Sequence, residues 1–87
     1  TSQMRRASIS IISNIAEGCG RRTEKELVNF LGIALGSSSE LESQSIIATD
    51  LGFLAAEDLD RLQSQLSEIQ KMLVKLIAKF KSQIEVI

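Results

Sequence analysis

Apolar residues recur along this chain with helical spacing, and the pattern is most regular in its last third. Between residues 59 and 80 they form a heptad seam, in which each step alternates between three and four positions. The residues on this seam are Leu59, Leu62, Leu66, Ile69, Leu73, Leu76 and Phe80. The seam predicts a long amphipathic helix that packs against a neighbouring helix.

Two further helices are indicated upstream. The first stripe comprises Met4, Ala7, Ile11 and Ile15, and the second comprises Leu27, Leu31, Ala34, Leu41 and Ala48. Glycines follow both stripes, at positions 18 and 20 and at position 52, where a helix stop is expected. Thr23 with Glu26 three residues later forms a capping box, which marks the start of the second helix. We therefore expect one domain over residues 1–87, with helices at about 3–18, 24–51 and 56–84.

The composition agrees with an all-α fold. The 87 residues include no proline, tryptophan or tyrosine and only three phenylalanines, which suits uninterrupted helices better than a β-sheet. The connections between the predicted helices are short, so neighbouring helices must run antiparallel. The expected architecture is an antiparallel up-down bundle of three helices.

Two stretches, residues 27–35 and 72–78, are apolar on more than one helix face. Such helices need cover on several sides, which three helices cannot supply. We expect a fourth helix, a homo-oligomer, or both. The residues assigned to a subunit interface are Val28, Ile33, Leu35, Met72 and Ile77. Gly32 and Gly36 form a small-x-x-x-small pair, which we expect to allow close helix packing in the bundle.

The net charge of −1 conceals a segregated distribution. Residues 1–25 carry five basic and two acidic side chains, residues 26–70 one basic and eight acidic, and residues 71–87 four basic and one acidic. In an up-down-up bundle the end of the first basic block meets the last block at one pole, where they can contact phosphates by charge, whereas Arg5 and Arg6 lie at the other pole. The residues assigned to this nucleic-acid site are Arg21, Arg22, Lys25, Lys75, Lys79 and Lys81. Helix-dipole matching and solvation are the competing explanation.

Residues that could carry chemistry are scarce. The chain has no histidine, and Cys19 is its single cysteine, so no internal disulfide and no catalytic or metal site is expected. We expect Glu17 to pair with Arg21 or with a neighbouring subunit, instead of acting as a base. No cofactor is predicted. No signal peptide or membrane-length apolar run is recognised, so the expected location is the cytoplasm, with no membrane contact.

Residues 13–22, from Ser13 to Arg22, carry a family resemblance. Together with residues 1–7, 30–37, 40–44 and 50–54, this segment resembles the bacterial four-helix-bundle family encoded by intervening sequences within 23S ribosomal RNA genes, whose members are sometimes labelled ribosomal-protein-like. The similarity covers about residues 1–55, whereas the third helix matches in pattern only. Three positions depart from the family pattern: Ile12 replaces a proline, Cys19 an aromatic residue and Ser45 a leucine.

The resemblance implies an up-down four-helix bundle that assembles into homopentamers and has no known enzymatic activity. It also implies a relation to the accessory protein of diversity-generating retroelements, a basic pentameric barrel that engages nucleic acid. This sequence begins where the family's second helix begins, so the family's first helix is expected to be missing from it.

Two functional hypotheses follow. The first is a non-enzymatic, oligomeric helical bundle that binds RNA or DNA through its basic pole. The alternative is a self-assembling scaffold that binds a protein partner and no nucleic acid.

Overall fold

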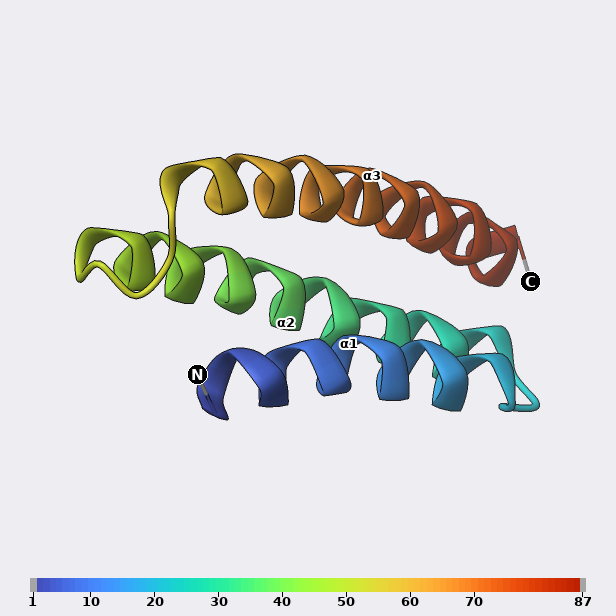
Figure 1. The fold of residues 1–87 in the computed structure, drawn as a ribbon. Helices are drawn as coiled ribbons and strands as arrows, with labels where there is room; N and C mark the ends of the chain where they lie inside the picture. The colour runs from blue at the N-terminus through green and yellow to red at the C-terminus, as the bar shows by residue number, and fades with distance from the viewer. Residues whose placement is uncertain (1, 87) are drawn as a thin grey trace.

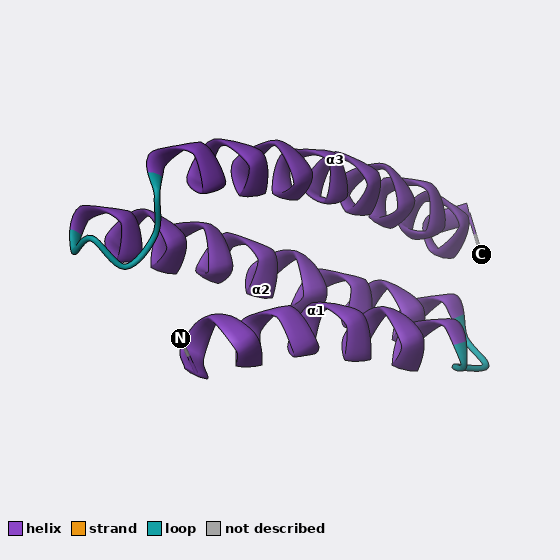
Figure 2. Cartoon of the chain, viewed as in Figure 1, coloured by secondary structure: helices purple, strands orange, loops and turns teal. Residues whose placement is uncertain are grey.

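Three helices make up the described part of the chain. The computed structural model describes residues 2–86, and within them α1 spans Ser2–Cys19, α2 spans Glu24–Asp50 and α3 spans Ala56–Val86 (Figures 1 and 2). No strand occurs within this range. The predicted all-α class is confirmed, and each helix end lies within two residues of its predicted position.

Local hydrogen bonds explain where α2 begins and ends. The Thr23 hydroxyl accepts a hydrogen bond of 3.2 Å from the Glu26 N–H, while the extended backbone of Thr23 stays outside the helix. At the other end Gly52 has a φ of +81°, which glycine adopts without strain. Its N–H bonds to the Thr49 carbonyl, and the Phe53 N–H bonds to the Ala48 carbonyl at 2.8 Å. These two bonds define a Schellman motif, which reverses the chain before α3.

The second helix lies between the other two and runs antiparallel to both (Figure 1). Within residues 2–86, no Cα atom of α1 comes within 8 Å of a Cα atom of α3, so α2 joins the two. The resulting molecule is elongated, with extents of 50 × 20 × 13 Å. Its two ends are therefore well separated, and each gathers residues from distant parts of the sequence.

A heptad seam on α2 forms the centre of the core. Its members, all buried, are Leu31, Ala34, Ser38, Leu41, Ser45 and Ala48. Four of the six are alanine or serine, which lets neighbouring helices approach closely. The two buried serines satisfy their hydroxyls locally, because Ser38 donates to the Leu35 carbonyl at 2.6 Å and Ser45 to the Glu42 carbonyl at 2.8 Å. Ser45, which replaces the leucine of the family pattern, is therefore fully buried with its hydrogen bond made.

The predicted seam of α3 packs against α2 as expected. Leu66 and Leu73 are buried, and the other seam residues are half-buried. Leu66 belongs to one core cluster with Ala7, Ile11 and Leu41, and Leu73 to a second cluster with Leu31 and Ala34. Ile15 packs against both clusters, so the core is continuous along the molecule.

Glycines behave differently on α1 and α2. A Cβ atom on Gly18 would lie 3.0 Å from Leu27 Cδ1 and 3.1 Å from Phe30 Cβ, so a glycine there allows α1 and α2 to meet closely. A Cβ atom on Gly32 or Gly36 would have no atom of another described segment within 4 Å. The expectation that these two glycines mediate close packing is wrong within the chain, because they lie on the face of α2 that points away from its seam.

Candidate nucleic-acid interface

The basic pole is the end of the molecule where α1 ends, α2 begins and α3 ends (Figure 1). The side chain of Gln83 on α3 reaches Glu24 on α2. With its amide oriented to donate, 2.7 Å separates its nitrogen from the Glu24 Oε1 atom. The basic residues of the α1–α2 turn and of the last part of α3 therefore lie at the same end of the molecule, as the predicted topology requires.

Arg21 is held by its own neighbours. Its Nη2 atom lies 2.7 Å from the Glu17 Oε2 atom, which confirms the predicted pairing. Its guanidinium also lies over the Phe30 ring, 4.9 Å from the centroid. The side chain stays 42% exposed, but these two contacts fix it across the α1–α2 turn. Arg21 is therefore less available to a phosphate than the sequence suggested.

Arg22 and Lys25 remain free. Both are exposed, and neither forms an ion pair with any residue that the structure describes. Glu24 and Glu26 are also exposed in this turn and partly offset the positive charge, although Glu24 has Gln83 as a partner. Near the α1–α2 turn, Arg22 and Lys25 can therefore contact a phosphate without first breaking an ion pair.

The three lysines of α3 that were assigned to the nucleic-acid site do not form one patch. Lys79 and Lys81 are two residues apart, so their side chains leave the helix roughly 200° apart. Lys75 lies one helical turn before Lys79 on the same face, and it lines a shallow groove together with Lys71 and Met72. The Lys79 ammonium lies 5.7 Å from the centroid of the Phe80 ring. The structure therefore places a lysine row on one side of α3 and Lys81 on another.

The residues assigned to a subunit interface also divide into two groups. Leu35 and Ile77 pack against the core cluster of Leu31 and Leu73, so the chain itself already covers much of both side chains. Ile33 and Met72 are 46% and 49% exposed. Val28 is half-buried. Ile33 and Met72 thus remain the most exposed of the assigned set.

The apolar side chains with the largest exposed fractions lie outside this assigned set. Ile12 on α1 is 69% exposed, and Leu51 and Phe53 in the α2–α3 turn are 66% and 76% exposed. Ile12 stands out in the sequence because it replaces the proline of the family pattern. The amphipathic pattern alone, however, does not distinguish Ile12, Leu51 and Phe53 from core residues. Their exposure depends on which helix faces find a neighbour.

Groups that could support catalysis or bind a metal are sparse in the described residues. No cluster of three or more cysteine, aspartate or glutamate side chains could hold a metal ion there. Cys19 is exposed at the end of α1. Asn14 donates to the Ser10 carbonyl and hydroxyl, and the Ser10 hydroxyl shares a 2.8 Å hydrogen bond with Ser37 of α2. The Ser10–Ser37 hydrogen bond connects α1 to α2. None of the three helices, over the described range, is long and apolar enough to span a bilayer.

These features define a class of small antiparallel helical-bundle proteins with a basic end. The family model for the 23S rRNA-intervening sequence protein matches residues 1–75 of the chain. The chain therefore belongs to the 23S rRNA-intervening sequence protein family, which agrees with the resemblance and extends it into α3. The family description names no enzymatic activity. No curated protein gives a significant match.

Proposed function

We propose that this protein is a non-enzymatic, self-associating helical bundle that binds nucleic acid, RNA in the first place, through its basic pole. The observation that carries the proposal is the pair of exposed cations in the α1–α2 turn, Arg22 and Lys25, which form no ion pair with the described residues. The row formed by Lys75 and Lys79 adds charge at the same end. The proposal includes a cytoplasmic location, where RNA would be available to the protein.

Self-association would multiply this charge. The exposed apolar side chains of Ile12, Ile33 and Met72 support contact with other copies of the chain. The family resemblance implies five subunits. A ring of copies would repeat Arg22 and Lys25 around one rim, and several weak phosphate contacts would then act together.

The expected binding is electrostatic and has little sequence preference. Each phosphate that a cation neutralises releases condensed counterions, so affinity falls with salt by about 0.7 of a log unit per contact on single strands. The chain has no tryptophan or tyrosine to stack on bases, and the exposed side chain at the end of α1 is Cys19.

A fluorescence-anisotropy titration of a mixed-sequence single-stranded RNA, at low and moderate salt, tests the proposal. Arg22→Glu with Lys25→Glu should abolish binding and leave helicity and oligomer size unchanged. Arg21 is left intact, because its contacts with Glu17 and Phe30 would confuse a loss of binding with a change in the turn. The matched control is Arg5→Glu with Arg61→Glu at the opposite end, which makes the same change in net charge.

Equal loss of affinity in both double variants would show that only net charge matters and would reject a site at the pole. Absence of binding by the unaltered oligomer at low salt would instead favour the scaffold alternative. The exposed side chains of Ile12 and Phe53 are the observation that supports that alternative.

A further inference from the structure

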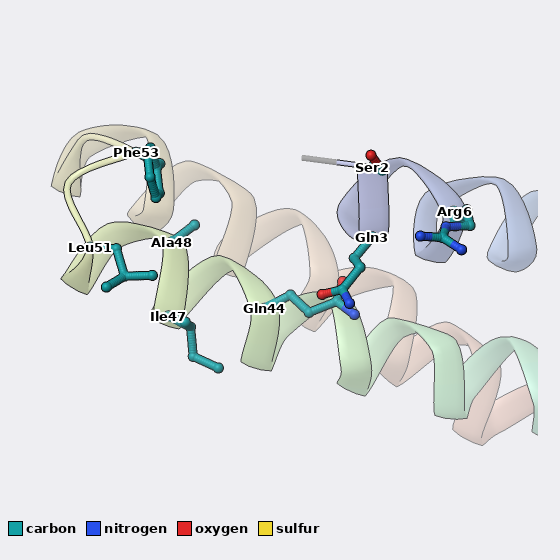
Figure 3. Close-up of a pocket in the computed structure, with 8 residues that line it drawn as sticks. All are labelled: Ser2, Gln3, Arg6, Gln44, Ile47, Ala48, Leu51 and Phe53. Carbon is teal, nitrogen blue, oxygen red and sulfur yellow. The ribbon is translucent and has the colours of Figure 1, made fainter.

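A cleft lies at the opposite end of the molecule from the basic pole, where α1 begins beside the last two turns of α2 (Figure 3). Its volume is about 330 Å³. The side chains that line it come from the first turns of α1, from the end of α2 and from the α2–α3 turn. Nothing in the basic pole or in the family description assigns a role to it.

One wall of the cleft is apolar and held in place. Ile47, Leu51 and Phe53 contribute exposed side chains, and Ala48 is buried behind them. The Schellman motif fixes this wall, because the Phe53 N–H bonds directly to the Ala48 carbonyl. An apolar group that entered would cover side chains that are now 57–76% exposed.

The opposite wall is polar and holds a buried acceptor without a donor. The Oε1 atom of Gln44 is buried and has no hydrogen-bond partner among residues 2–86. The side chains of Gln3 and Gln44 extend toward each other between α1 and α2, with Arg6 one turn further along α1 (Figure 3). Arg6 is exposed and forms no ion pair within residues 2–86. If the Gln44 amide rotated toward the cleft, its oxygen could accept from a ligand N–H and make a hydrogen bond that the free protein lacks.

These features together select a ligand with three groups: an apolar side chain, an N–H donor and an anion. We infer that the cleft binds the carboxyl-terminal residue of a partner polypeptide whose last side chain is apolar. That side chain packs against Ile47, Leu51 and Phe53, the backbone N–H of the residue donates to Gln44 Oε1, and its carboxylate pairs with Arg6. A fatty acid would satisfy the apolar wall and Arg6, but an ionised fatty acid has no donor for Gln44.

The probe is a short acetylated peptide, acetyl-Gly-Ser-Leu, measured by isothermal titration calorimetry. It is compared with the same peptide ending in a carboxamide and with acetyl-Gly-Ser-Ser. The leucine acid should bind at least about tenfold more tightly than the carboxamide, because the charge-assisted contact with Arg6 is lost. The serine peptide should also bind more weakly, since it leaves the apolar wall exposed.

Two variants and two controls locate the site. Arg6→Gln should remove the preference for the acid, whereas Arg5→Gln, one residue away on another face of α1, should not. Gln44→Leu should weaken peptide binding and raise the melting temperature of the free protein, because it removes a buried acceptor without a donor. Gln70 has a second buried amide atom without a partner, its Nε2, on α3. Gln70→Leu should therefore raise the melting temperature and leave peptide binding unchanged.

Equal binding of the acid and the carboxamide would overturn the inference, as would equal effects of the Arg5 and Arg6 variants. A lack of heat at about 1 mM peptide would overturn it too. These measurements involve no nucleic acid, so they stand or fall separately from the proposed function of the basic pole.

Discussion

Arg21 is a phosphate-binding candidate in the sequence, but in the fold its neighbours Glu17 and Phe30 give it a structural role. Its ion pair with Glu17 is about half exposed, so that contact contributes at most about 1 kcal/mol. The stacking on Phe30 contributes a similar amount, about 0.5–1 kcal/mol at an exposed site. Both contacts span the turn between α1 and α2. Together they make Arg21 part of the fold and leave Arg22 as the freer cation beside it.

At the same scale, two leucines of α3 should dominate stability. Leu66→Ala and Leu73→Ala should each lower the free energy of unfolding by about 2–5 kcal/mol, because both side chains are buried and the remaining cavity cannot fully collapse. Chemical denaturation measures this change.

The control for these variants has to lie on the exposed face of α3. Gln63 and Gln70 lie off the seam, but both are half-buried and cannot serve as exposed controls. Gln65 is exposed, and Gln65→Ala should change the free energy of unfolding by less than about 0.5 kcal/mol. A larger loss at Gln65 than at Leu66 would mean that α3 is rotated relative to α2.

Among the elements, α2 has two contrasting faces. One face is the buried seam of small and aliphatic residues, and the other carries Gly32 and Gly36 with no atom above them. A glycine inside a helix costs backbone entropy, and in this chain no close contact offsets that cost at the two positions.

Alanine at either bare glycine should therefore stabilise the fold. Gly32→Ala and Gly36→Ala should each raise the free energy of unfolding by about 0.5–1 kcal/mol, measured at a protein concentration at which sedimentation shows a monomer. Gly18→Ala is the contrasting variant, because its Cβ atom would press on Leu27 and Phe30 and offset the gain in helix propensity. Thermal denaturation at several concentrations distinguishes the sites. A loss of stability for Gly32→Ala that appears only at high concentration would reveal a second chain packed on this face.

The helices themselves could be predicted because their signals are local. The capping interaction of Thr23 and the stop at Gly52 involve residues a few positions apart, and the seam of α3 repeats with a fixed period. The exposed positions could not be predicted in the same way. Whether Ile12 is covered or Gly32 is packed depends on where neighbouring helices lie. In a stretch that is apolar on several faces, such as residues 27–35, the sequence does not show which face is buried. The candidate site could also be predicted only in part. The basic pole follows from the order and direction of the helices, whereas the contacts of Arg21 with Glu17 and Phe30 become visible only in the folded structure.

The whole molecule is a rod with different chemistry at its two ends. The basic pole contains the α1–α2 turn and the end of α3. The opposite end contains the acidic start of α3, Arg6 and the cleft. Exposed isoleucines on α1 and α2 lie between the ends. A rod of this kind can bind one partner at each end while its sides contact other copies.

Self-association should therefore depend on the sides of the rod. The chain should form a stable homo-oligomer at tens of micromolar, and Ile12→Lys should weaken it, because a buried unpaired charge would replace a buried apolar side chain at the contact. Ser13→Lys, at the neighbouring exposed position, is the matched control. Sedimentation velocity measures both. A monomer at these concentrations, or equal dissociation by the two lysines, would contradict an interface on this face of α1.

The position of α2 between its two neighbours also bears on how fast the chain folds. Since α1 and α3 approach α2 and not each other, every helix pairs with the one next to it in the sequence, across a connection of a few residues. Closing such short connections costs little chain entropy, and proteins dominated by sequence-local contacts fold on the order of microseconds to milliseconds. Either helical hairpin, α1–α2 or α2–α3, can form first, and the remaining helix then docks on a surface that already exists. Once all three helices have been synthesised, a chain arranged in this way can bury its apolar seams on that timescale.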